Sequence, residues 1–381
     1  MNSATPRPSY WESTTFFRSP DVAIVGAGLT GLQAALALKR SDPKMDVLLI
    51  ERTPVPRGAS TRNAGFACFG GPTELLADVD AYGEAATLAT VRQRLAGVRA
   101  LEVNFADRGI DWTKNGGFEV IDDDATAAMV LARLPRLNEM FADVMGTGET
   151  WSVVDSTLAV GMTLANPFEA QLHPGKLVTL LTNDCHRAGV RFLFGCTVDK
   201  LGAAAGAVKV EGAGWGSLTA GKVLLTVNGF AQRLLPKDFS ETIRPVRNQI
   251  LLSKPLADLR LRGCYHYHEG YVYFRNVGED RLLIGGARHL AGTISETDEF
   301  GPNKIPEAFL LEKLNGWFPY RKWTDADFPV RWSGIIAQGG GKSPVLRYAA
   351  DNVLVAARLA GMGVALSADL ARRAVEKLCA S

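Results

Sequence analysis

Residues 21–31 read DVAIVGAGLTG, and this stretch decides the fold. The β-branched run VAIV is typical of a buried parallel strand, and a glycine ends it. Gly26, Gly28 and Gly31 then form G-x-G-x-x-G, followed by the helix formers LQAALALKR. Such glycines allow a tight turn, close approach of the backbone to a pyrophosphate, and close packing of helix on strand. The stretch therefore predicts a strand–turn–helix unit whose helix N-terminus faces phosphates.

The residues that follow indicate which dinucleotide binds. A second apolar strand, VLLIE, ends at Glu51, about where this fingerprint places a carboxylate for the ribose hydroxyls. No second G-x-G-x-x-G lies in a strand–helix unit, so a separate nicotinamide domain is not expected. The glycine-rich stretch PRGASTRNAGFACFGG, residues 56–71, comes directly after the second strand. A single dinucleotide site near the N-terminus with this stretch beside it indicates FAD.

Composition narrows the class of protein. The chain has 381 residues, which favours two domains, and its net charge of +2 comes without any run of Lys and Arg. We therefore expect neither nucleic acid nor anionic membrane as a partner. Its five cysteines are odd in number and contain no C-x-x-C, which favours reduced thiols in the cytoplasm. The first 20 residues lack a secretory signal pattern. Residues 22–38 are apolar enough to resemble a membrane span, but the strand–turn–helix unit explains them better, so no integral membrane segment is expected.

Two segments, DVAIVGAGLTGLQAALAL and LLIERTPVPRGASTRNAGF, resemble the D-amino-acid-oxidase-like flavoproteins. That superfamily includes glycine oxidase, sarcosine oxidase, D-amino-acid dehydrogenases and γ-glutamylputrescine oxidoreductase. The later segments HPGKLVTLLTNDCHRAGVRFLFGCTV, GKVLLTVNGFAQRLLP, IRPVRNQILL and NVLVAARLAGMGVALSADLARRAVEKL follow in the family's order. The family's covalent cysteine has no counterpart near Gln338 to Lys342, which implies non-covalent FAD. The cofactor-binding residues that the motif and the resemblance imply are Gly26, Ala27, Gly28, Leu29, Thr30, Gly31, Glu51, Arg52, Ser60, Thr61, Arg62, Asn63, Gly65, Val198, Asn228, Gly229, Gly361, Met362, Gly363 and Val364.

The resemblance also implies an α/β fold of two interleaved domains. A Rossmann-type FAD-binding domain is expected from residues 1–78, 168–243 and 333–381. An α+β substrate domain, built on an antiparallel or mixed sheet, is expected from residues 79–167 and 244–332. Helical periodicity over Glu84–Arg108 and Thr126–Met145, the second interrupted by Pro135, agrees with this division. The segments EGYVYFR and RLLIGGAR are typical of strands joined by a turn.

The resemblance implies an enzyme that oxidises the C–N bond of an amine or amino-acid derivative by hydride transfer to flavin N5, giving an imine. Tyr273 falls where the family places an active-site tyrosine, although the pattern equally fits an aromatic on a half-buried strand. Arg275, two residues on and thus on the same face, is a candidate anchor for a substrate carboxylate. Gln249 and Arg288 are further polar candidates, each of which the pattern also explains as a surface residue.

Two departures from the family point to the kind of substrate. Ile336 and Gly361 stand where glycine-oxidase-like members carry carboxylate-binding arginines. We therefore expect a larger amine substrate than glycine, such as an N-substituted amino acid or a γ-glutamyl polyamine. Oxygen, a quinone or another electron carrier each fits as the electron acceptor.

Two other functions stay open on the same scaffold. A 2-hydroxy-acid dehydrogenase needs a base, for which His266, His268 or His289 would serve. An electron-transferring flavoprotein subunit is the second alternative, although no C-x-x-C favours it. No metal site is expected: His266 and His268 alternate on one strand and are taken as solvated, and Cys68 as a small buried hydrophobe.

Overall fold

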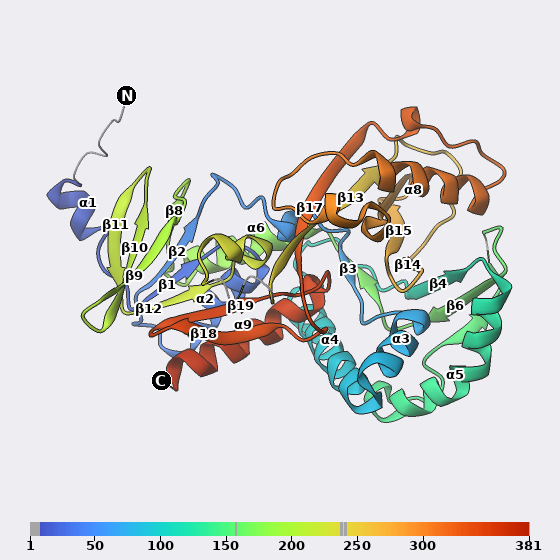
Figure 1. Cartoon of the computed structure of the whole chain (residues 1–381), viewed down its shortest axis with the longest axis horizontal. Coiled ribbons are helices and arrows are strands. Elements are labelled where there is room, and N and C mark those ends of the chain that lie inside the picture. The colour runs from blue at the N-terminus through green and yellow to red at the C-terminus, as the bar shows by residue number, and fades with distance from the viewer. Residues whose placement is uncertain (1–7, 157, 237–238, 240–241, 381) are drawn as a thin grey trace. The chain divides into compact units, whose positions relative to one another are not determined.

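A computed structural model describes residues 8–156, 158–236, 239 and 242–380 (Figure 1). The chain divides into two compact units, each built from separate segments of sequence. Unit 1 comprises Met1–Thr61, Gly175–Pro245 and Ile335–Ser381, and unit 2 comprises Arg62–Pro174 and Val246–Gly334. The expected interleaving of two α/β parts is thus present, and the predicted fold class is confirmed.

Unit 1 is built on a six-stranded sheet whose strands, apart from one at the edge, run parallel. Its strands are, in order across the sheet, β18 (Val345–Ala350), β19 (Val353–Ala357), β12 (Lys222–Leu225), β1 (Val22–Val25), β2 (Val47–Glu51) and β8 (Arg191–Phe194). The helices of this unit are α1 (Tyr10–Thr14), α2 (Leu29–Ser41), α6 (Pro174–Arg187) and α9 (Gly363–Cys379). A separate three-stranded sheet holds β9 (Lys200–Ala204), β10 (Ala207–Gly212) and β11 (Gly216–Ala220).

The sequence of β1 explains its central place in this sheet. All four of its residues are buried, because β12 and β2 flank the strand and both of its faces are covered. Every residue of β2 is buried as well. Helix α2 packs against α9, and Gln33 joins them by donating from Nε2 to Ser367 Oγ at 2.8 Å. The glycine-rich turn after β1 is therefore held by a rigid core.

Unit 2 is built on a mixed eight-stranded sheet, in which the described pairs are antiparallel except β14 with β4. Its strands are, in order across the sheet, β17 (Val330–Gln338), β13 (Arg244–Leu252), β16 (Arg281–Gly286), β15 (Val272–Val277), β14 (Cys264–Tyr267), β4 (Gly117–Ile121), β6 (Met162–Asn166) and β5 (Ser152–Val154). A short two-stranded sheet joins β3 (Phe66–Ala67) to β7 (Ala170–Gln171).

The helices of unit 2 cover apolar clusters on this sheet. They are α3 (Pro72–Tyr82), α4 (Glu84–Phe105), α5 (Asp124–Met145) and α8 (Lys304–Trp317), with the 3₁₀ segments η3 (Arg288–Ser295), which is kinked at Gly292, and η4 (Asp325–Asp327). The two helices predicted from periodicity are confirmed as α4 and α5. The predicted interruption at Pro135 is wrong, because α5 continues through that residue. The strands predicted from EGYVYFR and RLLIGGAR are β15 and β16, joined by a turn at Gly278.

The bounds of the units differ from the expected domains by two residues at 244–245 and 333–334, and by more at two other places. Residues 62–78 and 168–174, expected in the cofactor domain, lie in unit 2. The reason is local pairing: β3 bonds with β7 through Ala67 and Ala170, and α3 packs against α4 and α5. The glycine-rich stretch 56–71 is consequently divided between the two units.

Candidate cofactor and substrate sites

The turn after β1 brings helix and strand closer together than any residue but glycine permits. Gly26 has φ of +106°, which L side chains rarely adopt. A Cβ on Gly31 would lie 2.0 Å from the Gly26 carbonyl oxygen and 2.7 Å from Thr226 Oγ1. That hydroxyl donates to the carbonyl of Val25 at 2.9 Å, which ties β12 to the end of β1. Close packing of α2 on the sheet thus depends on Gly31.

The N-terminus of α2 presents its first N–H groups to oxygen acceptors. Gly28 is the N-cap and makes no side-chain cap, and Leu29 N donates to Ser60 Oγ at 2.9 Å. Ala27 N donates to Glu51 Oε2 at 3.0 Å. A Cβ on Gly28 would lie 2.9 Å from Ser60 Oγ, so glycine leaves room there for an oxygen atom. Free backbone N–H groups and the positive end of the helix dipole favour anions at a turn of this kind.

The carboxylate of Glu51 is held in place at the end of β2. Besides Ala27 N, it accepts from Thr53 N at 3.2 Å and from Thr53 Oγ1 at 2.7 Å. The next residue, Arg52, lies over the ring of Phe230 at 3.8 Å. The predicted acid thus stands beside the glycine turn, with a fixed orientation.

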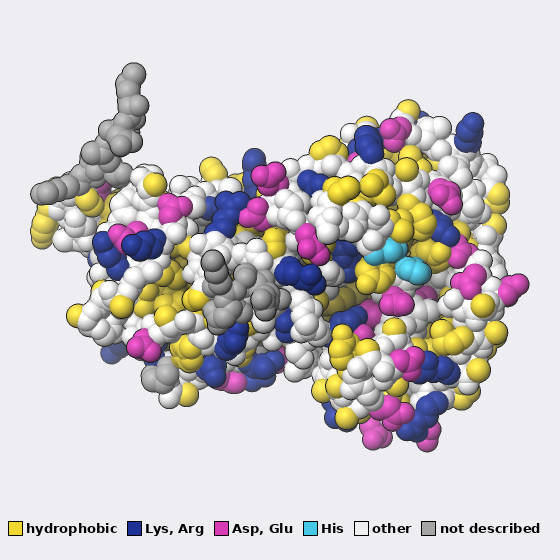
Figure 2. Space-filling view, in the orientation of Figure 1, with side chains coloured by type: hydrophobic (Ala, Val, Ile, Leu, Met, Phe, Trp, Pro, Cys, Tyr) yellow, Lys and Arg dark blue, Asp and Glu magenta, His cyan; other side chains and the backbone are white. Residues whose placement is uncertain are grey.

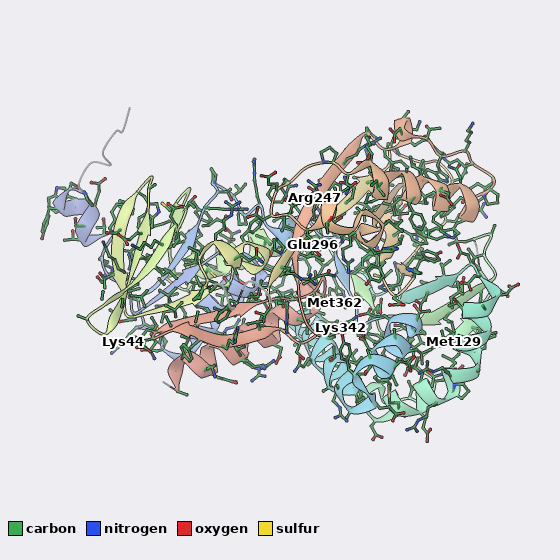
Figure 3. The ribbon with its side chains drawn as sticks, viewed as in Figure 1. Lys44, Met129, Arg247, Glu296, Lys342 and Met362 are labelled. Atoms are coloured by element: carbon green, nitrogen blue, oxygen red, sulfur yellow. The ribbon has the colours of Figure 1, made fainter. Side chains whose placement is uncertain are left out.

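A second turn of unusual backbone precedes α9 in the same unit. Arg358, Ala360 and Gly361 have φ of 61°, 47° and 89°, and nothing lies within 4 Å of a Cβ built on Gly361. Asn228, itself at φ of 45°, accepts from Arg358 N through Oδ1 at 3.0 Å. Met362 comes next, as the N-cap of α9 (Figure 3). Positive φ at non-glycine residues costs free energy and is concentrated at functional sites.

The remaining predicted cofactor residues are divided between the two units. In unit 1, Val198 and Thr30 are buried, and Thr61 Oγ1 donates to the Pro56 carbonyl at 2.9 Å. Also in unit 1, a Cβ on Gly229 would lie 2.8 Å from the Ile336 carbonyl. The three that lie in unit 2 are Arg62, whose Nη1 donates to the Ser333 carbonyl at 2.9 Å, Asn63, whose Oδ1 accepts from Gly65 N at 2.7 Å, and Gly65 itself, at φ of +75°.

Tyr273 faces the first residues of the glycine-rich segment in unit 2. Its ring meets that of Phe66 edge-on, with centroids 5.8 Å apart. Its hydroxyl accepts a hydrogen bond from Asn248 Nδ2 at 3.1 Å, and Asn248 Oδ1 is buried without a partner among the described residues. Burial raises the pKa of Tyr273, although the nearby charge of Arg288 opposes this, so the side chain is a neutral phenol.

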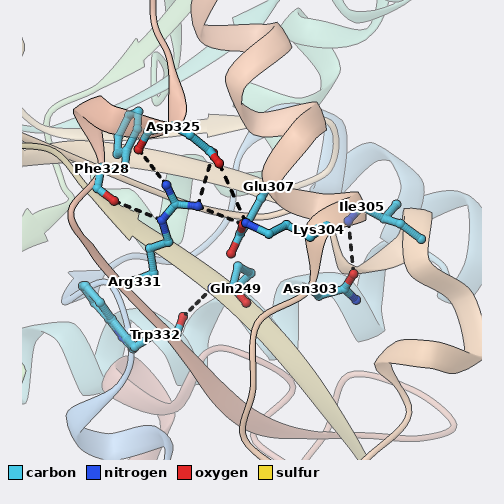
Figure 4. Close-up of polar contacts among 9 residues, drawn as sticks. All are labelled: Gln249, Asn303, Lys304, Ile305, Glu307, Asp325, Phe328, Arg331 and Trp332. Atoms are coloured by element: carbon cyan, nitrogen blue, oxygen red, sulfur yellow. Dashed lines mark hydrogen bonds and ion pairs between the residues drawn. The ribbon is translucent and has the colours of Figure 1, made fainter.

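Gln249 lies on the opposite face of the sheet from Tyr273. Across the sheet, Ile250 of β13 pairs with Gly285 of β16, which pairs in turn with Tyr273 of β15, so these residues share one face. Gln249 precedes Ile250 by one residue, so its side chain points to the other face. Its Nε2 donates to the Trp332 carbonyl at 3.2 Å. Beside it Glu307 of α8 accepts from Arg331, as Figure 4 shows. The structure therefore does not bring Gln249 together with the other predicted catalytic residues.

Arg275 shares the face of Tyr273 but is engaged with backbone carbonyls. Its Nε donates to Ala64 at 2.5 Å, its Nη2 to Leu172 at 3.0 Å and its Nη1 to Asn276 at 3.2 Å. Burial lowers the pKa of Arg275, and the side chain is 7% exposed. The bonds to Ala64, in the glycine-rich stretch, and to Leu172, just after β7, fasten both segments to β15, which is a structural role.

We expect Arg275→Lys to destabilise unit 2 by about 2–4 kcal/mol, because a lysine cannot reach three carbonyls in a fork and leaves buried acceptors unpaired. The measurement is urea unfolding of the flavin-free protein. A matched control is Arg281→Lys, which changes a less buried arginine at the start of β16. A lysine variant with unchanged stability but a raised KM would instead mark Arg275 as a substrate anchor.

The charge of Arg288, a polar candidate from the sequence, acts on Tyr273, and the candidate base His289 lies beside Arg288 in the chain. The Arg288 guanidinium stands over the Tyr271 ring at 4.7 Å, and burial lowers the pKa of Arg288. The rings of His289 and His268 stack at 5.1 Å, and histidine side chains reach the surface of unit 2 in Figure 2. Burial, with the charges of His268 and Arg288, lowers the pKa of His289 to about 4, so His289 is neutral at pH 7.

A family model decides what this arrangement is for. The model described as "FAD dependent oxidoreductase" matches residues 21–377, nearly the whole chain. The chain belongs to this family. It is therefore an FAD-dependent oxidoreductase, and the predictions of enzyme class and cofactor are confirmed.

One curated protein is similar in sequence, and solved structures are similar in fold. The chain is 26% identical over 366 residues to the probable oxidoreductase OrdL of Rhizobium meliloti (strain 1021), covering 92% of this chain and 81% of that protein. Iminodiacetate oxidase from Chelativorans sp. BNC1 has a TM-score of 0.75 at 17% identity, over 94% of this chain and 95% of its own. Glycine oxidase from Geobacillus kaustophilus has a TM-score of 0.72 at 19% identity, over 94% and 95%. At these identities the two structures establish the fold alone.

The residues of unit 1 fit FAD. The space beside Gly28, which a Cβ would fill, and the N–H groups at the start of α2 suit a pyrophosphate. Glu51 stands where a ribose is expected, and the open turn at Gly361 precedes the positive end of α9. Within the residues that the structure describes, no helix is long and apolar enough to span a bilayer.

Ser60→Ala tests the pyrophosphate position in this family member. We expect FAD affinity to fall about tenfold, which is about 1.4 kcal/mol, because the hydroxyl that reaches Leu29 N is lost. Fluorescence titration of the apoprotein with FAD measures this. Thr61→Ser, which keeps a hydroxyl at the neighbouring residue, should stay within twofold. Equal affinity of Ser60→Ala and the unmodified protein would contradict a role for Ser60 in cofactor binding.

Proposed function

We propose that this enzyme oxidises the C–N bond of an amine or amino-acid derivative, giving an imine. The observation that carries the proposal is the pair of neutral polar groups, Tyr273 and Asn248, on one face of β15 and β13. Asn248 Oδ1 is a buried acceptor without a partner among the described residues, and a substrate N–H would satisfy it. When the amine is neutral, the carbon beside its nitrogen can transfer a hydride without help from a strong base.

Tyr273 is placed to orient such a substrate. Because Asn248 Nδ2 already donates to the phenol oxygen, the phenol's own proton is left to donate to a substrate oxygen. Arg288, whose charge lies near this phenol, is our candidate for a substrate carboxylate. We keep Arg275 and Gln249 out of the chemical step, since the first bonds to three carbonyls and the second lies on the other face of the sheet.

In our proposal the cofactor residues of unit 1 hold FAD non-covalently. Gly28, the Leu29 N–H and Ser60 would hold the pyrophosphate, and Glu51 a ribose. When bound, FAD supplies the oxidising chemistry by accepting a hydride from the substrate carbon at N5. The N–H groups of residues 362–364, at the positive end of α9, would stabilise negative charge on the flavin and so favour its reduction.

The names of the structural neighbours support an amine as substrate. Glycine oxidase and iminodiacetate oxidase are named for compounds with a nitrogen beside the oxidised carbon. Ile336 and Gly361 take the places of two family arginines, so we propose a substrate larger than glycine, such as an N-substituted amino acid or a γ-glutamyl polyamine.

One observation favours the 2-hydroxy-acid alternative. With its pKa lowered to about 4, His289 is neutral at pH 7, and its Nδ1 is buried without a partner among the described residues. The unpartnered Nδ1 can accept the proton of a substrate hydroxyl, while the lowered pKa makes His289 a weak base for this step. His266 is less suited, because it is buried and bonded to Glu169.

Anaerobic mixing of the purified flavoprotein with candidate substrates tests the proposal. The panel holds D-amino acids, N-methyl amino acids, γ-glutamyl polyamines and 2-hydroxy acids, and the readout is bleaching of the flavin absorbance. Bleaching by an amine supports the proposal, and bleaching by hydroxy acids alone replaces it with the alternative. Bleaching by none of them, with reduction by a redox partner protein, would indicate an electron-transferring subunit. Admitting oxygen, or a quinone, then identifies the acceptor.

We expect Tyr273→Phe to lower the rate of flavin reduction about tenfold to a hundredfold while leaving FAD bound, because only the hydroxyl is lost. Stopped-flow absorbance on the substrate found above measures this rate. Tyr265→Phe serves as the control, because Tyr265 lies on β14 and stacks between Phe118 and Phe274 on the other face of the sheet. An unchanged rate in Tyr273→Phe would remove Tyr273 from the proposed site.

A further inference from the structure

One side-chain cluster in unit 2 has no part in the proposed function. Cys68, Glu169 and His266 each offer one ligand atom, and the sulfur, oxygen and nitrogen all lie within 4.8 Å of one another. All three residues are buried, with exposures of 6%, 0% and 6%. The sequence separates each from the next by about a hundred positions, so the fold alone brings them together.

The backbone explains this convergence. Ala67 of β3 pairs with Ala170 of β7 in an antiparallel register, which places Cys68 opposite Glu169 at the next position. His266, on β14, reaches Glu169 from the large sheet, with Nε2 and Oε2 2.8 Å apart. The expected pairing of His266 with His268 on a solvated strand face is therefore wrong, because β14 ends at Tyr267 and His266 is buried.

Packing fixes the carboxylate toward the other two groups. A Cβ on Gly117 would lie 2.4 Å from Glu169 Oε2, so the carboxylate occupies space that only glycine leaves open. The Phe66 ring meets the imidazole of His266 edge-on, with centroids 5.4 Å apart, which limits its rotation. The three ligand atoms are thus gathered before any ion arrives, and an ion that binds there replaces the hydrogen bond between His266 Nε2 and Glu169 Oε2.

We propose that Cys68, Glu169 and His266 bind a Zn²⁺ ion that joins the short β3–β7 sheet to β14. Thiolate sulfur, imidazole nitrogen and carboxylate oxygen are the donors that zinc takes in proteins, at about 2.0–2.3 Å. The Cys68 thiolate and the Glu169 carboxylate together neutralise the two charges of the ion, as burial requires. Glu169 can supply both of its oxygens, which completes four ligands. Binding releases the Cys68 thiol proton, and His266 ligates as a neutral imidazole through an unprotonated Nε2, with its one proton on Nδ1.

A neighbouring thiol provides a matched control. Cys264, on β14 as well, is buried like Cys68, but its sulfur bonds to the Ala170 carbonyl at 3.3 Å and it does not belong to the ligand group. Replacing either cysteine by serine makes the same chemical change in the same unit. Only one of the two removes a proposed ligand.

The experiment measures zinc in the flavin-bound, full-length enzyme after incubation with excess ZnCl₂ and desalting. We expect about one ion per chain, falling at least tenfold in Cys68→Ser and in His266→Gln and unchanged in Cys264→Ser. Co²⁺ in place of zinc should produce a thiolate-to-metal absorption band in the unmodified protein, and Cys68→Ser should lack it. Mass spectrometry counts the metal without any assay of catalysis, so failure here is distinct from failure of the proposed function.

Three results would overturn the site. The first is less than a tenth of an equivalent of zinc in the unmodified enzyme. The second is equal zinc in Cys68→Ser and Cys264→Ser. The third is a cobalt-loaded unmodified protein without a thiolate band. Because the first and third use only the unmodified enzyme, they hold even where a variant does not fold.

Discussion

Gly28→Val protein is expected to fold but to be purified without flavin. A Cβ at residue 28 would lie 2.9 Å from Ser60 Oγ, and the two methyl groups of valine would fill the space that glycine leaves open at the N-terminus of α2. In our proposal the FAD pyrophosphate needs that space and the N–H of Leu29. We expect the affinity for FAD to fall at least a hundredfold, about 2.7 kcal/mol. Flavin absorbance of the purified protein and titration of the apoprotein measure the loss.

The control for this variant is Gly58→Ala, in the glycine-rich stretch of the same unit. No atom lies within 4 Å of a Cβ built on Gly58, and its φ is not in the left-handed region. Its affinity should stay within twofold of the unmodified protein. Gly28→Val protein that retains its flavin at full occupancy would refute the assignment of this turn to the pyrophosphate.

The sequence predicts best those parts of the fold that are encoded within one short stretch of residues. The motif at residues 21–31 contains strand, turn and helix within one stretch, so its fold was predictable from spacing alone. The helices α4 and α5 were predictable from periodicity for the same reason. The predicted interruption at Pro135 was wrong, because a helix that is held by tertiary packing can continue through a proline.

Side-chain placement on the large sheet was harder to predict. Alternation along β13 puts Asn248 and Gln249 on opposite faces, and only the cross-strand register shows that Asn248 is the one that meets Tyr273. Arg275 was correctly placed on the face of Tyr273, yet its carbonyl partners come from residues 64 and 172, which no local pattern indicates.

The cluster of Cys68, Glu169 and His266 could not be predicted from the spacing of residues in the sequence. Cys68, Glu169 and His266 share no motif, and each alone is explained as a buried side chain. Their meeting depends on which short strands pair, and a two-residue strand such as β3 carries almost no periodic signal. The pairing of strands that are far apart in the sequence is therefore what a single sequence does not reveal.

Gly31→Ala is expected to destabilise unit 1 itself, before any question of cofactor. The added Cβ would lie 2.0 Å from the Gly26 carbonyl oxygen, a backbone atom of the turn, and 2.7 Å from Thr226 Oγ1. The first atom is backbone, and the second is held by hydrogen bonds to the carbonyls of Val25 and Gly26, so α2 must move away from β1. Overpacking of this kind costs about 1–3 kcal/mol, and we expect the upper end of that range.

Urea unfolding of flavin-free Gly31→Ala protein measures this loss separately from any change in FAD binding. The matched control is Gly202→Ala on β9, where nothing lies within 4 Å of the new Cβ, and its stability should change by less than about 0.5 kcal/mol. If flavin-free Gly31→Ala were as stable as the control, the close contact between helix and strand would not be what this glycine provides. Its place in the motif would then be explained by FAD binding alone, which is the role that we assign to Gly28.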